Sequence, residues 1–343
     1  MSRRALTLLV AGIGAAVLAL AGAVLPVPYV VLSPGPTFNT LGTQNGKPLI
    51  TVSGHRVYPT RGHLNLVTVS FQGGPGDEID LFTALSAWLS PHDAVVPQAE
   101  VFGTSTNVQQ VQRQNVQEMT DSQELATAAA LTELKIGFTT VVIVAATVPG
   151  MPASSVLHAG DVITAVDGTP VSSADRAASL IRAHHVGTPV ELTVSTNGQV
   201  RTVRLVTKSE HGQPAVGIVV SDQFKFPFPV QIRVGDVGGP SAGMMFALGL
   251  VDKLSPDDLA AGRFIAGTGE IDAKGNVSPI GGIQQKLVGA RNQGATIFLA
   301  PASNCPDVRG SVPPGLRIVK VSTLGQAVRD LRAIDAGKPV PSC

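Results

Sequence analysis

The N-terminal apolar run restricts the fold of this chain more than any other feature. An uncharged stretch extends from Ala5 to about Val31, directly after Arg3 and Arg4. As a helix it is long enough to cross about 30 Å of hydrocarbon. Because basic residues flank its short N-terminal side, we expect that end in the cytoplasm and the rest of the chain outside.

The alternative for this run is a cleaved signal peptide, since "ALAGA" offers small residues near a cleavage site. The apolar run continues past it to Tyr29, which is longer than a usual signal core. We therefore favour an uncleaved anchor over residues 1–31. It predicts a single-pass plasma membrane protein with the lipid bilayer as one partner.

The bulk composition argues against nucleic-acid binding. The chain has 343 residues, a formal net charge of +1 and only 4% aromatic residues. No basic stripe is present, so the electrostatic footprint of a nucleic-acid partner is missing. The length is more than one core usually needs, and two or three domains are expected.

The segment 32–125 is predicted to be a β-rich and helical region outside the membrane. "LITVS" and "LNLVTVSF" have the composition of strands. "DLFTALSAWLS" predicts a short helix that ends before Pro91. A longer helix-forming stretch follows, in which Thr120 or Asp121 is positioned to cap a second helix.

The pattern of residues 136–208 is that of one compact module. Short β-like runs alternate with a turn at Asp167–Gly168, a helix near 174–184 and a hairpin through Asn197–Gly198. "GMPASSVLHAGDVITAVDGTPV", with the helix and strand pair after it, resembles a PDZ domain. We place the boundaries of this domain at 126–208.

A resemblance to PDZ domains implies binding of an extended peptide as an added strand. The carboxylate loop of such a domain precedes a strand, and "KIGF" is the candidate for it. Ile136, Gly137 and Phe138 are then the predicted peptide-binding residues. An ordinary strand entrance is the alternative for this short match.

The last segment, 213–343, mixes strands and helices. A helix is predicted from Ser241 to Leu254, and "GIQQKLVGARNQG" predicts another that ends at Gly294. "TIFLAP" and "LRIVKVS" predict strands, and "LGQAVRDLRAI" a final helix. The expected fold class is α+β multidomain, with an N-terminal transmembrane helix, a β-rich region, a PDZ domain and an α+β C-terminal domain.

Within this segment "GPSAG" fits G-x-S-x-G, which places a nucleophilic serine, Ser241, at a sharp turn. An α/β-hydrolase needs a histidine after the serine, but all seven histidines precede it. The order His, Asp, Ser of chymotrypsin-like enzymes is not excluded, although a histidine from an upstream module would have to reach the serine. Lysine is the remaining common base, in a Ser-Lys pair.

Of the lysines after Ser241, Lys286 best suits a general base. Its predicted helix places Ile283 and Ala290 beside it, at i−3 and i+4, on a largely apolar surface. Burial lowers the pKa of a lysine, and only neutral lysine accepts a proton. A surface lysine with a buried stem is the alternative. The other candidates lie in a turn, a tail, a helix end and a strand: Lys274, Lys338, Lys253 and Lys320.

"GGPSAG", "GTGEI", "PIGGIQQKLVGA" and "GATIFLAP" together resemble, in order and spacing, the proteolytic domain of Lon (endopeptidase La) proteases. The resemblance covers about residues 215–335. It implies that Ser241 is the nucleophile, Lys286 the general base and Thr268 a polar neighbour of the lysine. It also suggests a homo-oligomeric ring, with a hexamer as the candidate.

Two glycine and proline positions support the serine turn in this interpretation. Gly239 suits a close backbone approach, and Pro240 suits the first turn of a helix. ATP-dependent Lon usually has an aspartate three residues before the serine, where this chain has Gly238. The whole layout is similar to the membrane-anchored, PDZ-containing Lon-like proteases of bacteria, in which Gly238 is expected.

These features predict an ATP-independent serine endopeptidase of the bacterial cell envelope. ATP is not expected because no G-x-x-x-x-G-K-[ST] occurs, and a zinc protease is not expected because no H-E-x-x-H occurs. We predict no metal and no other cofactor. Expected partners are polypeptides: unfolded chains, tails or exposed loops that the PDZ module selects. The alternatives are a catalytically silent PDZ scaffold and a protease limited to self-processing.

The chain has two cysteines, Cys305 and Cys343. Outside the cytoplasm they can form a disulfide that tethers the C-terminal tail. Two unrelated thiols are the alternative. Their spacing does not fit a metal site.

Overall fold

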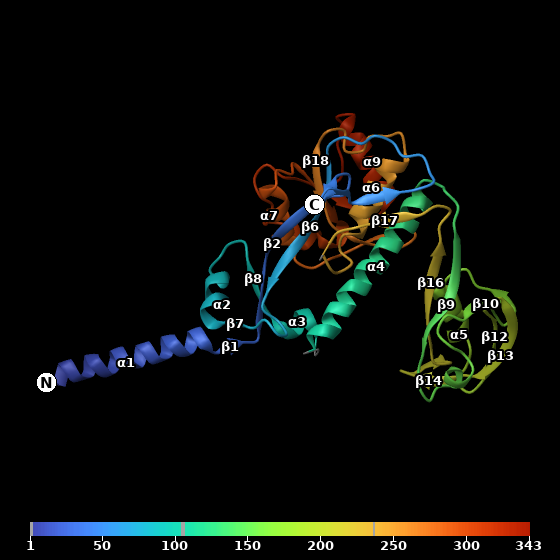
Figure 1. Cartoon of the computed structure of the whole chain (residues 1–343), viewed down its shortest axis with the longest axis horizontal. Coiled ribbons are helices and arrows are strands. Elements are labelled where there is room, and N and C mark those ends of the chain that lie inside the picture. The colour runs from blue at the N-terminus through green and yellow to red at the C-terminus, as the bar shows by residue number, and fades with distance from the viewer. Residues whose placement is uncertain (1–2, 104–106, 236) are drawn as a thin grey trace. The chain divides into compact units, whose positions relative to one another are not determined.

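The computed structural model describes residues 3–103, 107–235 and 237–343 and divides the chain into two compact units (Figure 1). The first combines Met1–Ile136 with Phe228–Cys343, and the second is Gly137–Pro227. The second unit is therefore an insertion within the first. The boundaries expected from the sequence differ from this division, since they separate 32–125 from 213–343.

The first unit begins with helix α1 (Arg3–Val24), whose side chains are exposed almost throughout. By length and composition α1 can cross a membrane. After it, β1 (Pro26–Val27) pairs with β7 (Ile79–Asp80). Helix α2 (Leu81–Trp88) starts where the Asp80 carboxylate accepts the backbone N–H groups of Phe82 and Thr83.

One six-stranded sheet carries the first unit. Its order is β22-β21-β18-β6-β2-β8, in which β22, β21, β18 and β6 are parallel and β2 and β8 antiparallel to their neighbours. These strands are β22 (Arg317–Val321), β21 (Ile297–Pro301), β18 (Phe264–Gly267), β6 (His63–Gln72), β2 (Tyr29–Asn39) and β8 (Ala94–Pro97).

The region predicted as 32–125 therefore does not form a sheet of its own but completes this one. Its strand β6 carries a fully buried run, Leu64 to Val67, that pairs with β2 on one side and β18 on the other. Such a run needs partners on both edges and cover on both faces. The segment after Phe228 supplies β18 on one edge and the covering helices, and β2 of the N-terminal segment supplies the other edge.

Helices cover both faces of this sheet. Gly267 of β18 faces α6 (Gly243–Leu254), because a Cβ there would meet Met245 at 2.7 Å. The preceding residue, Ala266, belongs to a hydrophobic core cluster that also contains buried residues of α7 (Ile283–Asn292). Since successive side chains of a strand point to opposite faces, α6 and α7 lie on opposite faces of the sheet.

Helix α4 (Val108–Glu133) is one continuous helix that packs on α6, together with α9 (Leu324–Asp335). The prediction of a second helix capped at Thr120 or Asp121 is wrong. The Thr120 hydroxyl instead donates to the carbonyl of Val116 within the helix, as threonines inside helices do.

Shorter elements complete the first unit. A hairpin joins β3 and β4, strand β5 pairs with β17, and β19 pairs with β20. These strands are β3 (Thr43–Gln44), β4 (Lys47–Pro48), β5 (Ile50–Val52), β17 (Val230–Ile232), β19 (Glu270–Ile271) and β20 (Val277–Ser278). Two short helices are α3 (Gln98–Phe102) and α8 (Cys305–Val308).

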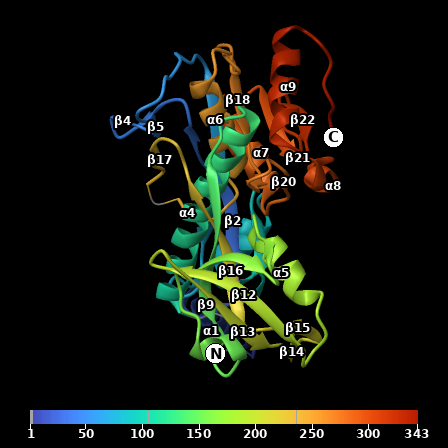
Figure 2. The same ribbon diagram turned by 90° about the vertical axis from the view of Figure 1, so that its right-hand side faces the viewer.

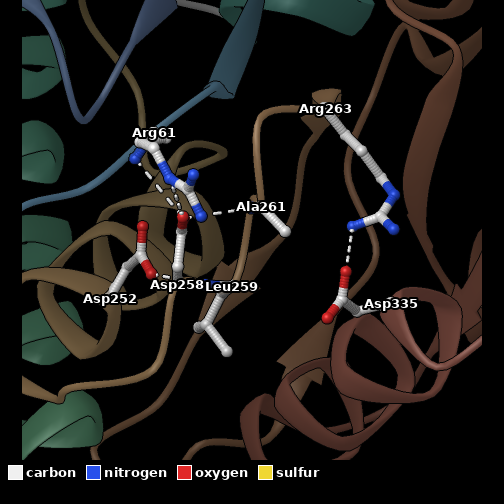
Figure 3. A network of polar contacts seen from close by, with 7 residues as sticks. All are labelled: Arg61, Asp252, Asp258, Leu259, Ala261, Arg263 and Asp335. Carbon is white, nitrogen blue, oxygen red and sulfur yellow. Dashed lines mark hydrogen bonds and ion pairs between the residues drawn. The ribbon is translucent and has the colours of Figure 1, made fainter.

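The loop between α6 and β18 is fixed by a polar network (Figure 3). Arg61 Nε lies 2.8 Å from an Asp258 carboxylate oxygen, and Arg263 pairs with Asp335 at 2.8 Å. The Leu259 N–H donates to Asp252, which is fully buried on α6. These contacts set where β18 enters the sheet.

The second unit has a sheet of order β13-β12-β10-β9-β16, with β11 beside β10. Helix α5 (Ala174–Arg182) lies beside β16, where the Ala174 N–H donates to Asp222 (Figure 2). The strands of this unit are β13 (Gln199–Val206), β12 (Pro189–Thr196), β10 (Val162–Val166), β9 (Thr139–Thr147), β16 (Ile218–Lys225), β11 (Thr169–Pro170), β14 (Lys208–Glu210) and β15 (Gln213–Ala215).

The expected end of the PDZ domain at residue 208 differs from the structure. Strand β16 pairs with β9 along its whole length and belongs to this sheet. The apolar core is built from inward residues of β9, β10, β12 and β13 with Ala177 and Ile181 of α5. The unit therefore continues to Pro227.

Candidate active site

Ser241 lies in the turn that leads into α6 and is half-buried. Gly239 has a φ of 84°, a left-handed conformation that favours glycine. Pro240 follows it, and its carbonyl accepts the N–H of Gly243 at 3.3 Å. Gly239 and Pro240 thus form the bend that brings Ser241 to the start of the helix.

Helix α4 holds this bend from a distant part of the sequence. The Gly239 N–H donates to the carbonyl of Asn115 at 3.3 Å. The buried Ser122 hydroxyl donates to the carbonyl of Pro240 at 3.0 Å. Sequence reasoning missed Asn115 and Ser122, because no local pattern indicates which helix will cover the serine turn.

The backbone of Ser241 is bound to the carboxyl end of β18. Its carbonyl accepts the N–H of Gly269 at 2.8 Å and the Thr268 hydroxyl at 2.9 Å. Thr268 is fully buried. The G-T-G-E stretch therefore anchors the serine turn to the central sheet. Thr268 thus has a structural role in addition to being a polar neighbour of the lysine.

Lys286 reaches the same point from α7. Its side chain is only 3% exposed, and Ile283 and Ala290 are buried beside it. Its Nζ lies 2.8 Å from Ser241 Oγ and 3.0 Å from Thr268 Oγ1. The structure thus brings Ser241, Lys286 and Thr268 together, and the apolar helix face predicted around the lysine is present.

The hydrogen-bond directions around Thr268 leave the lysine free to accept a proton. Thr268 has one hydroxyl proton, which it donates to the Ser241 carbonyl. Its oxygen must therefore accept a hydrogen from Lys286 Nζ. A neutral amine bound in this way keeps a lone pair that can face Ser241 Oγ at 2.8 Å.

The electrostatics of the site favour a neutral lysine. Burial lowers the pKa of Lys286 from 10.5 to about 7, while the nearby Glu270 carboxylate opposes this effect. Burial also raises the pKa of Glu270, with a further rise from Glu118 of α4. The lowered pKa of Lys286 therefore favours the neutral amine far more than the pKa of an exposed lysine would.

The residues predicted to bind a peptide lie between the end of α4 and the start of β9. The Ile136 N–H donates to the carbonyl of Leu131 and ends α4. Gly137 is exposed, and the Phe138 ring lies edge-on against Phe224 and Phe226.

The second unit instead has a hollow of about 410 Å³ between α5 and the β15–β16 segment. Side chains of both elements line it, among them Ala178, Ile181, Val216, Ile218 and Val220. Ile136, Gly137 and Phe138 are not among the lining residues. "AVGIVV", a glycine turn before an apolar run, is the sequence signal that could have indicated it.

Cys305 and Cys343 form a disulfide that ties the C-terminal tail to α8. The Lys320 N–H also donates to the carbonyl of Pro341 in that tail. Among the described residues, no group of three or more His, Cys, Asp or Glu could hold a metal ion.

Two family models match separate segments of the chain. The family model of the Lon protease (S16) C-terminal proteolytic domain matches residues 232–331, and that of the PDZ domain matches 108–207. The PDZ match begins with α4, which packs on α6, and ends before β16. The structural unit is therefore shifted toward the C-terminus relative to the matched range.

Curated relatives match about a third of the chain. Lon protease of Heliobacterium modesticaldum is 37% identical over 131 residues, which cover 36% of this chain and 16% of that protein. Lon protease 1 of Bacillus subtilis is 35% identical over 118 residues, covering 33% of this chain and 15% of that protein. The matched segment thus spans only about a sixth of the relatives' length.

Solved PDZ domains are similar to about a quarter of the chain. That of an SdrC-like protein from Listeria monocytogenes is 28% identical, covers 23% of this chain and 85% of its own, and has a TM-score of 0.22. The one from Listeria innocua is 27% identical, with coverages of 23% and 92% and a TM-score of 0.22. By the two family models, the chain combines a segment similar to PDZ domains with a segment similar to the C-terminal proteolytic domain of Lon (S16) proteases.

Proposed function

We propose that this protein is a membrane-anchored serine endopeptidase that works without ATP, with Ser241 as nucleophile and Lys286 as general base. The observation that carries the proposal is the 2.8 Å contact between Lys286 Nζ and Ser241 Oγ in a site where the lysine is 3% exposed. A buried lysine next to a serine has the protonation state that proton abstraction needs.

In the proposed reaction, neutral Lys286 takes the Ser241 hydroxyl proton as Oγ attacks a peptide carbonyl. The resulting ammonium remains bound to Thr268 Oγ1 and then protonates the leaving amine. Lys286, neutral again, activates the water that hydrolyses the acyl-enzyme. The lysine thus serves both half-reactions, as histidine does in a Ser-His-Asp triad.

The oxyanion of this reaction would form at the start of α6. The backbone N–H of Ser241 precedes the first turn of that helix, where N–H groups and the helix dipole favour negative charge. One such donor contributes about 3–4 kcal/mol to transition-state stabilisation. This N–H shares its planar peptide group with the Pro240 carbonyl, which accepts from the Ser122 hydroxyl and the Gly243 N–H, so it is preorganised.

A location outside the cytoplasm is supported by two features. Helix α1 is long and apolar enough to span a bilayer, with Arg3 and Arg4 at its N-terminal end. The Cys305–Cys343 disulfide is of a kind that persists in oxidising compartments. The first 31 residues are then the cytoplasmic tip and plasma membrane anchor.

The PDZ unit is proposed to bind polypeptide substrates in the hollow between α5 and β16, rather than at Ile136, Gly137 and Phe138. Strand β16 is the last strand of its sheet, paired only with β9 among the described strands. Its other edge faces α5, so an extended peptide can add to it there. The Lon resemblance also implies a homo-oligomeric ring, which remains a prediction. Measuring the size of the particle in detergent would test it.

Proteolysis is tested with the full chain in detergent, an unfolded protein as substrate and no ATP. Products are identified by mass spectrometry. We expect the wild type to cut, and Ser241→Ala and Lys286→Met to lose about 100-fold or more in rate. Ser278→Ala and Lys274→Met change an exposed serine and an exposed lysine of the same unit and serve as matched controls.

Each alternative has its own outcome. Cutting by Ser241→Ala at the wild-type rate would remove the serine from the mechanism. No cutting by any form, together with peptide binding by the PDZ unit, would favour the silent scaffold. If the wild type cuts only itself and leaves added Ser241→Ala chain intact, the activity is limited to self-processing.

A further inference from the structure

Helix α2 has an apolar face that is largely exposed, although α1 approaches it at Leu81 and Phe82. Its exposed side chains, with Leu89 after it, are between 42% and 77% accessible: Leu81, Phe82, Leu85, Trp88 and Leu89. Ala84 and Ala87 form the opposite, buried side, against Val31 and Ile79. The helix carries no charged residue. Large apolar side chains concentrated on one helix face mark an interaction surface.

This face lies at the C-terminal end of α1. A Cβ at Gly22 would be 3.2 Å from the Phe82 ring, so the two helices are in van der Waals contact. Directly after α1, strand β1 pairs with β7, which leads into α2 (Figure 1). The sheet pairing and the Gly22–Phe82 contact together fix α2 beside the last turn of α1.

The position of α1 determines what α2 meets. A helix of 22 residues is about 33 Å long and fills the hydrocarbon core from end to end. Its last residue, Val24, and the following Leu25 are exposed and apolar, and with α1 spanning the bilayer they would lie where the bilayer meets water. A neighbour of Gly22 is therefore at the depth of the headgroups, where tryptophan is enriched.

We propose that α2 is an interfacial helix that lies on the lipid bilayer and inserts Phe82, Leu85, Trp88 and Leu89 at the boundary between headgroups and acyl chains. This inference rests on the proposed membrane anchor. Interfacial helices bury their apolar face about 5–10 Å into this boundary. Since α2 packs on β2 and β8, the contact would hold that edge of the sheet at the membrane.

The contact is with apolar lipid rather than with anionic headgroups. Helix α2 has no lysine or arginine, and the loop before it carries Asp77 and Glu78, both exposed. Acidic side chains gain nothing from an anionic surface. Vesicles of phosphatidylcholine alone should therefore suffice, and added anionic lipid should not strengthen the contact.

Trp88 is the only tryptophan of the chain and reports on its own depth. The full chain is reconstituted into phosphatidylcholine vesicles whose acyl chains carry bromine near the headgroup end or near the methyl end. We expect a blue-shifted emission that shallow bromines quench more than deep ones. Leu85→Gln with Leu89→Gln should reduce the quenching, and because both side chains are exposed the fold should persist.

A relocated tryptophan serves as control. In Trp88→Phe with Val312→Trp, the reporter lies in the exposed loop before β22, at the opposite edge of the sheet. It should remain unquenched by either lipid. Equal quenching at both positions would mean nonspecific adsorption and would overturn the proposal.

Two further readouts separate this inference from the proposed function. Flotation of the chain with vesicles tests the anchor alone, and Ser241-dependent cutting tests the protease. If the chain floats and cuts but Trp88 is open to an aqueous quencher and insensitive to bromines, α2 does not lie on the bilayer. If Trp88 is shielded from both quenchers, another protein covers the face, and the proposal is equally wrong.

Discussion

At the scale of single residues, the burial of Lys286 determines how the proposed enzyme should respond to pH. Its pKa is lowered to about 7 by burial, and only the neutral form can accept the serine proton. Activity should therefore be low below this pKa and rise as the pH increases through it. We expect kcat/KM for a short peptide to rise about tenfold per pH unit below about 7 and then level off.

Glu270→Gln provides the matching control for this profile. The Glu270 carboxylate raises the pKa of Lys286 against the effect of burial. Removing its charge should move the midpoint of the profile to lower pH. A midpoint that stays in place, or a flat profile in the wild type, would contradict the assignment of Lys286 as the base.

Thr268 is predicted to position both dyad residues. Thr268→Val removes the hydrogen bonds to Lys286 Nζ and to the Ser241 carbonyl while nearly conserving volume. Two lost bonds of about 1 kcal/mol each predict a loss of about tenfold or more in kcat. Thr268→Ser keeps both bonds and should restore most of the rate. A loss in Thr268→Ser as large as in Thr268→Val would point to packing instead.

Asp252 should make the fold less stable at neutral pH. Burial raises its pKa from 3.8 to about 6, so the folded state holds a proton that the unfolded state has already lost. This contribution to stability is complete below the unfolded pKa and is lost as the pH rises through about 6. Above that, a charged carboxylate with one oxygen unpartnered remains buried (Figure 3).

Asp252→Asn keeps an acceptor for the Leu259 N–H and cannot ionise. Thermal unfolding in detergent should show the same free energy of unfolding as the wild type at acid pH. At pH values above the raised pKa of Asp252, the variant should be more stable than the wild type by up to about 3 kcal/mol. Asp335→Asn, which changes an exposed ion-pair partner, should show little effect. A constant gain at every pH would remove the ionisation argument.

At the scale of elements, α4 explains why residue 238 is glycine. A Cβ at Gly238 would lie 2.8 Å from the Asn115 Cβ, closer than real Cβ contacts allow. The resemblance to ATP-dependent Lon would predict an aspartate there, but α4 occupies that space. The same helix donates to Pro240 through Ser122 and accepts from Gly239 through Asn115.

Gly238→Asp should therefore displace the serine turn. A shift of this turn lengthens the contact between Ser241 and Lys286, and we expect kcat/KM to fall about tenfold or more. Asn115→Gly removes the conflicting Cβ, so the double variant should recover part of the activity. If the double variant is no better than Gly238→Asp alone, the loss has a cause other than α4.

The sequence predicted well those elements whose signals are local. The face of α7 around Lys286 and the short helix α2 before Pro91 depend on patterns within one helix, and both are present. Predictions of element and domain boundaries failed where the boundary depends on a partner that is distant in the sequence. Strand β16 joins β9, about 80 residues before it, and the continuity of α4 past Thr120 is favoured by its packing on α6.

At the scale of the whole molecule, the proteolytic unit is assembled from both ends of the chain. Leu64, Leu66 and Val67 of β6 are at most 1% exposed and pair with β18 and β2. Burial of such side chains contributes about 1.5–3 kcal/mol each. A fragment from Phe228 to the C-terminus lacks them and leaves one edge of β18 unpaired, so it should not fold alone.

The PDZ unit, by contrast, should be removable. Its first and last strands pair Thr139 with Lys225, so the chain enters and leaves it at neighbouring points. Replacing Gly137–Pro227 by a short glycine linker should leave the thermal unfolding of the first unit and the hydrolysis of short peptides nearly unchanged. Selection among longer polypeptides should be lost, because the hollow beside α5 is gone. If short-peptide hydrolysis also fails in a folded variant, the PDZ unit contributes to catalysis itself and not only to the choice of substrate.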